Sequence, residues 1–156
     1  MLLLIRKLNL PINSQTRIVY NKSDYSFSFI DCEEQRINSS ILINDIQLHL
    51  DESSTIVSLD GFCPLMQAKV TSHYPLLIEK SQLQVIADTP FIPGVSLRYN
   101  SKRWPVYRNS KDGWICVGNL SSDFYLECLC GCVLGFSPKN SMDINALWIK
   151  HQTVDH

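Results

Sequence analysis

The stretch Asp45-Ile-Gln-Leu-His-Leu50 alternates polar and apolar side chains with a period of two. Successive side chains of a β-strand point to opposite faces of the sheet, so this pattern predicts a strand with one buried face. Ile46, Leu48 and Leu50 are expected in the core, and His49 is expected among the solvated polar side chains.

The same alternation recurs through the first two thirds of the chain. It is found in Tyr25–Phe29, Gln82–Val85 and Val95–Tyr99. Turn-forming pairs separate the runs, among them Asp60-Gly61 and Asp112-Gly113. Short strands at close spacing predict a mainly β fold, an antiparallel β-sandwich or barrel-like domain with at most one or two short helices. A length of 156 residues predicts one globular domain over residues 1–156.

The last third of the chain has a different pattern. Trp114–Gly118 and Phe124–Phe136 are nearly continuous apolar runs, which are typical of central strands covered on both faces. Ile144–Lys150 is predicted to be a final strand, and residues 151–156 a frayed tail. Gly113–Gly118 together with Ala146–Lys150 resembles the C-terminal ends of small uncharacterised bacterial proteins. That resemblance covers about the last third and implies no function.

The cysteines predict free thiols. They are Cys32, Cys63, Cys116, Cys128, Cys130 and Cys132. Their spacing is uneven, and a chain of this length does not need disulfides to fold, so a reducing compartment is expected. The apolar start is too short for a secretory signal, and no run reaches the roughly 20 residues of a membrane span. We therefore expect a cytoplasmic protein that is not bound to a membrane.

Cys128, Cys130 and Cys132 would share one face of a regular strand. Neighbouring same-face positions lie about 6.6 Å apart, too far for sulfurs that bind one zinc ion. The spacing therefore favours buried core, although Gly131 permits a turn in which a metal could bind. No metal and no cofactor is predicted.

No catalytic motif is present. A nucleophilic Cys63 would need a base such as His73 within hydrogen-bond reach, which the sequence does not show. The chain contains no Gly-x-Ser-x-Gly, no P-loop and no dinucleotide fingerprint. These absences favour a protein that is not an enzyme. A β-fold enzyme or small-molecule binder, with a site that is not visible in sequence, remains an alternative.

The formal net charge of -1 conceals two segregated patches. Residues 24–60 carry eight acids against the single base Arg36, whereas residues 98–111 carry five bases and no acid. The acidic stretch predicts a protein-binding domain, for example an immunity-type inhibitor that masks a basic toxin or nuclease. The expected contact residues are Asp31, Glu33, Glu34, Asp45, Asp51 and Glu52.

The basic stretch supports an alternative, nucleic-acid binding. Its cations alternate with aromatic side chains, a mixture that can neutralise phosphates and stack on bases. The expected contact residues are Arg98, Lys102, Arg103, Trp104, Tyr107 and Arg108. The overall negative charge makes this alternative weaker than a protein partner.

Overall fold

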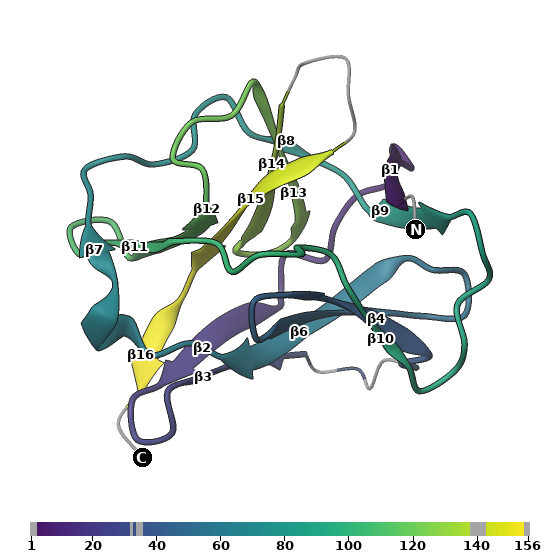
Figure 1. Ribbon diagram of the computed structural model, residues 1–156, viewed down its shortest axis with the longest axis horizontal. Helices are drawn as coiled ribbons and strands as arrows, with labels where there is room; N and C mark the ends of the chain where they lie inside the picture. Colours follow the sequence, from purple (N-terminus) through teal and green to yellow (C-terminus); the bar gives the residue numbers. More distant parts are fainter. Residues whose placement is uncertain (1–2, 32, 34–35, 138–142, 155–156) are drawn as a thin grey trace.

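The computed structural model describes residues 3–31, 33, 36–137 and 143–154. Two seven-stranded sheets pack against each other in two layers, which confirms the mainly β fold and the sandwich alternative (Figure 1). The one helical element within those residues is the single 3₁₀ turn Leu65–Gln67, labelled η1. No helix there has the length and apolar character of a membrane span.

The first sheet forms the lower layer in Figure 1. Its strands, in spatial order, are β10 (Ser96–Arg98), β4 (Ser39–Ile43), β5 (Ile46–Leu50), β6 (Ile56–Phe62), β3 (Ser26–Ile30), β2 (Arg17–Asn21) and β16 (Gln152–Val154). The five inner strands are antiparallel. The outermost strands β10 and β16 run parallel to their neighbours.

The second sheet has the same plan. Its strands, in spatial order, are β7 (Lys69–Val70), β11 (Val106–Asn109), β12 (Trp114–Gly118), β15 (Ile144–Lys150), β14 (Cys132–Phe136), β13 (Phe124–Leu129) and β8 (Glu79–Lys80). Its inner strands are antiparallel, and the short β7 and β8 pair in parallel at the two edges. A separate two-stranded antiparallel sheet, β1 (Leu3–Lys7) with β9 (Leu83–Ala87), lies at one side of the sandwich (Figure 1).

The main core lies between the two sheets. Ile46, Leu48 and Leu50 of β5 are at most 1% exposed, as their alternation predicts. His49 is also buried, so its expected place on a solvated face is wrong. The reason is its position on an inner strand, where Asp60 from the neighbouring β6 approaches it, with the Asp60 Oδ2 atom 2.9 Å from His49 Nε2.

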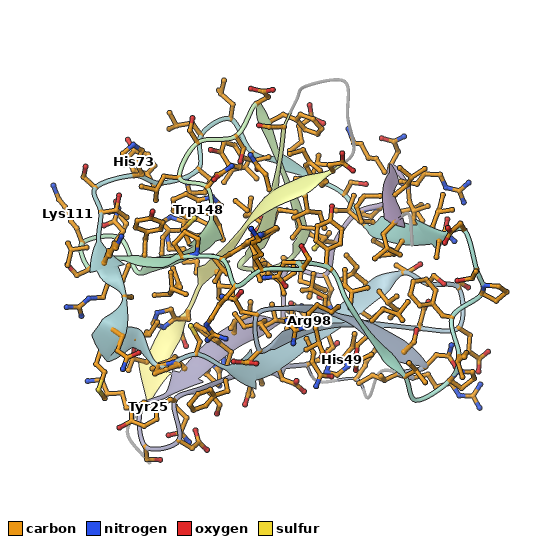
Figure 2. The ribbon with its side chains drawn as sticks, viewed as in Figure 1. Tyr25, His49, His73, Arg98, Lys111 and Trp148 are labelled. Carbon is orange, nitrogen blue, oxygen red and sulfur yellow. The ribbon has the colours of Figure 1, made fainter. Side chains whose placement is uncertain are left out.

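The second sheet is covered on its outer face as well, which confirms the prediction from its apolar runs. Cys116, Val133, Ala146 and Trp148 form a small buried cluster there (Figure 2 labels Trp148). Ile78 and Leu120, which lie in connecting segments, pack against it. Phe124–Phe136 is nevertheless not one strand, because the chain turns back between β13 and β14 at Gly131, whose φ is +90°.

The C-terminal segment crosses from one sheet to the other. After β15 in the second sheet, Gln152–Val154 pairs with β2 in the first sheet as β16 (Figure 1). The predicted frayed tail is therefore wrong for these three residues, because backbone hydrogen bonds to an open sheet edge hold them. Residues 155–156 lie outside the described part of the chain.

Candidate functional site

Four of the predicted acidic contact residues gather at one edge of the first sheet. Asp31 and Glu33 follow the end of β3, and Asp51 and Glu52 follow the end of β5. Both strands run antiparallel to β6, which lies between them, so their C-terminal ends point to the same edge, where Asp31 and Asp51 line one hollow. We call these four residues the acidic edge.

The two aspartates of the acidic edge also shape its turns. Asp31 Oδ1 accepts a hydrogen bond from the Glu33 backbone N–H at 3.0 Å. Asp51 Oδ1 accepts from the backbone N–H groups of Ser53 and Thr55 at 2.9 and 3.0 Å. Short aspartate side chains often close turns in this way. Glu33 and Glu52 are exposed, so these two carboxylates are the ones best placed to meet a partner.

The other two predicted acidic contacts are not part of this edge. Asp45 lies in the β4–β5 turn, at the opposite end of β5, and its Oδ2 forms an ion pair with Arg103 Nη1 at 3.0 Å. The prediction that Asp45 shares one surface with the others is therefore wrong. Glu34 lies outside the described residues.

Apolar and basic side chains adjoin the acidic edge. Ile30 is 42% exposed and Ile37 is 53% exposed. Arg36 pairs with Glu52 at 3.4 Å, and Arg17 is opposite Ile30 at the start of β2. Among the described residues the edge thus has four carboxylates against two guanidinium groups. A hollow of about 240 Å³, lined in part by Asp31 and Asp51, opens beside it.

The basic segment is divided by its internal contacts. Arg98 Nη1 donates to the backbone oxygen of Asn44 at 2.9 Å, and Arg103 pairs with Asp45. Lys102 is exposed, whereas Arg108 lies on β11 in the other sheet and faces a cavity. The sequence therefore overestimates the continuity of this basic surface, because residues 98–111 connect two layers of the sandwich.

The aromatic side chains of the same segment pack inward. Trp104 is half-buried against the main core and meets Tyr99 edge to face, with ring centroids 6.1 Å apart. Tyr107 is half-buried against the small cluster on the outer face of the second sheet. Neither ring forms an outward stacking platform with the arginines, so the geometry offers little support for the nucleic-acid alternative.

The cysteine cluster forms a hairpin instead of sharing one face of a single strand. Cys128 and Cys132 are buried on facing strands, with their sulfurs 3.8 Å apart, while Cys130 lies at the turn. The expected common face is therefore wrong for Cys130. Within the described residues, no group of three or more His, Cys, Asp or Glu side chains could hold a metal ion.

Cys63 is buried beside a hollow of about 270 Å³. Burial raises the pKa of its thiol to about 11, since removal from water disfavours the thiolate. Among the described residues, no histidine or acid lines this hollow, and His73 is exposed with its Nδ1 atom 3.0 Å from the Thr71 hydroxyl. These surroundings do not activate Cys63 as a nucleophile.

A larger cavity, of about 500 Å³, lies between the sheets near β16. Strands β2, β11, β12 and β16 and the turn η1 supply its walls, and its lining includes Tyr20, Leu65, Arg108, Ile115 and His151. Of these lining residues, only Arg108 was predicted from the sequence to be functional, and His151 was expected in a frayed tail. No local signal identified the site, because its walls come from five separate segments.

His151 makes the stability of this region depend on pH. The centroid of its ring lies 5.5 Å from that of Tyr20 and 5.6 Å from that of Phe27. Burial lowers the pKa of His151 below the ordinary value of 6.5. A folded-state pKa below the unfolded one means that the unfolded chain binds the proton more readily, so stability falls as the pH drops below about 6.5. In urea titrations at pH 7.5 and 5.5, His151→Phe should lose less stability on acidification than wild type. Equal losses would contradict this assignment.

Comparison with known proteins leaves the family open. No known protein family matches this chain, and no curated protein matches its sequence.

Proposed function

We propose that this protein is a non-enzymatic binding domain whose acidic edge docks onto a basic protein, in the manner of an intracellular inhibitor that covers a basic toxin or nuclease. The observation that carries the proposal is the convergence of Asp31, Glu33, Asp51 and Glu52, from two separate connections, onto one sheet edge. Excess negative charge on one edge would steer a basic partner toward it and speed the encounter.

The apolar neighbours of the edge support a docking role. Ile30 and Ile37 are about half exposed beside the carboxylates. Interfaces commonly combine an apolar centre with a polar and charged rim. Glu33 and Glu52 would form such a rim, while the turn bonds of Asp31 and Asp51 keep the backbone of the edge in place.

Charge reversal tests the proposal. The variant Glu33→Lys/Glu52→Lys changes two exposed carboxylates that, within the described part of the chain, make no backbone turn bond. The control Asp112→Lys/Asp123→Lys makes the same change in net charge on exposed residues of the other sheet. A basic protein captured from the source cells and identified by mass spectrometry should associate about 10-fold or more slowly with the first variant, because steering raises association rates by about 10–1,000-fold. The control variant should reduce the association rate much less.

Surface plasmon resonance at several salt concentrations gives these association rates. The rate constant for wild type should fall steeply as the salt concentration rises, and more steeply than that of the Glu33→Lys/Glu52→Lys variant. Capture of no basic protein, or equal rates for the two double variants, would be evidence against the acidic edge as the docking surface.

A further inference from the structure

We propose that the cavity between the sheets near β16 binds a small aromatic carboxylate, with the aromatic body inside the sandwich and the carboxylate on Arg108. This inference is independent of the acidic edge, which lies at a different part of the first sheet. It assigns to the protein a second, small-molecule site.

The size and walls of the cavity suit a small aromatic ligand. Its volume of about 500 Å³ falls within the range of roughly 300–1,000 Å³ that is usual for ligand sites. Leu65 and Met66 from η1 and Ile115 from β12 supply apolar wall, and Tyr20 supplies an aromatic ring. A largely apolar lining with a few polar groups is the usual composition of such sites.

The wall next to η1 is fixed in place by Tyr20. The Tyr20 hydroxyl donates to the backbone oxygen of Cys63 at 2.7 Å and accepts from the backbone N–H of Leu65 at 3.4 Å. The Tyr20 ring also packs against Phe27 and His151. The wall that Tyr20 forms is therefore already held by the core before a ligand binds, which lowers the entropy cost of binding.

Arg108 and Lys22 are the Lys and Arg side chains that line the cavity among the described residues, and Arg108 is the one proposed to bind the carboxylate. It is opposite Ile115 in the β11–β12 pair, so its side chain points to the same inner face as that buried residue. Among the described residues its guanidinium makes no hydrogen bond and no ion pair, and no acidic residue lines the cavity. A guanidinium binds a carboxylate through two parallel hydrogen bonds.

Side-chain hydrogen bonds brace the turn of the hairpin that carries Arg108. The neighbouring Asn109 side chain donates to the backbone oxygen of His73 at 2.9 Å and accepts from the backbone N–H groups of Lys111 and Asp112 at 3.2 and 3.3 Å. Gly113 completes the turn with a φ of +73°. Arg108 is the last-but-one residue of a strand whose turn is fixed by side-chain bonds, so the backbone that carries its exposed side chain is held in place.

A matched pair of probes tests the proposal. 1-Naphthylacetate and its neutral amide, 1-naphthylacetamide, have nearly the same shape and differ in charge. In isothermal titration calorimetry on the full chain, wild type should bind one equivalent of the carboxylate, with an affinity about 10-fold or more above that for the amide. Arg108→Gln should weaken carboxylate binding by about 10- to 100-fold and leave amide binding nearly unchanged, because only the carboxylate can use the charge.

Two further variants locate the site. Lys111→Gln removes an exposed charge three residues away that does not line the cavity, so it should leave both affinities within about 2-fold. Thr153→Trp places a large side chain on an exposed position that does line the cavity, so it should weaken both probes.

Three outcomes would overturn the inference. The first is that wild type binds neither probe. The second is that Arg108→Gln weakens the two probes equally or leaves carboxylate binding unchanged. The third is that Thr153→Trp binds both probes as wild type does.

Discussion

Replacement of Asn44 by alanine is expected to destabilise the fold by about 3–5 kcal/mol, which is one of the two largest effects expected for a single substitution. Asn44 is 3% exposed and lies in the β4–β5 turn. Its Oδ1 accepts from Trp104 N–H at 2.9 Å and from Asn100 Nδ2 at 2.7 Å, and its Nδ2 donates to the Trp104 backbone oxygen at 3.0 Å. Alanine would remove all three hydrogen bonds, and Asn100 Nδ2 would keep only its bond to the Lys102 backbone oxygen at 3.1 Å.

The backbone of Asn44 adds a second contribution, since its φ is +52°. Glycine adopts this conformation without strain, so Asn44→Gly should be about 1 kcal/mol less destabilising than Asn44→Ala. Asn9 provides the matched control, because it has a φ of 56° but is exposed and its side chain makes no hydrogen bond within the described residues. Asn9→Ala should therefore cost only about 1–2 kcal/mol.

Urea denaturation of these variants measures the differences. If Asn44→Ala were no more destabilising than Asn9→Ala, the buried hydrogen bonds would contribute nothing beyond the backbone conformation. That result would contradict the role assigned to Asn44 as the residue that ties the β4–β5 turn to the segment before β11.

Trp148→Ala is expected to cost about 3–5 kcal/mol as well, or to prevent folding at 37 °C. Trp148 is fully buried in the small cluster on the outer face of the second sheet. It meets Trp114 edge to face with centroids 6.3 Å apart, and Cys116 and Val133 are its partners on the two neighbouring strands. Alanine would leave a cavity that a β-sheet cannot easily collapse.

The variant Trp148→Phe distinguishes the contribution of ring packing from that of the indole N–H group. The Trp148 Nε1–H group is buried and has no hydrogen-bond partner in the described structure. Phenylalanine removes that unpaired donor while it keeps most of the ring, so it should cost only about 1–2 kcal/mol. Urea denaturation at one pH compares the two variants. Equal losses for Ala and Phe would contradict the prediction that the packing of the ring, and not the indole N–H, stabilises this cluster.

The acidic stretch shows how far sequence could locate a surface. Its composition predicted a negative patch, and four of its residues do meet at one edge. The prediction for Asp45 was wrong because it considered only closeness in the sequence. Asp45 and Asp51 flank the five-residue strand β5 and therefore lie at its opposite ends. Asp45 instead forms an ion pair with Arg103, a residue of the basic stretch that lies far from it in the sequence.

Several strands gave no alternating signal. β4 is buried at four of its five positions, so its polar and apolar residues do not follow a period of two. β7, β8 and β16 are two or three residues long and exist because a neighbouring strand offers an unpaired edge. Their sequences alone carry too little preference to predict a strand, since tertiary context decides short β pairings.

By itself the sequence determined the fold class. Alternation in Ile46–Leu50 and continuous apolar runs near residues 114 and 124–136 fix which side chains must leave water, and burial of apolar surface is the dominant force in folding. The tertiary structure alone decided which distant residues meet. It brought Arg108, Tyr20 and His151 around one cavity and turned the cysteine run into a hairpin. The physical reason is that the period of two determines which side chains of a strand point to the core, whereas strand order is set by the pairing and packing of the whole chain.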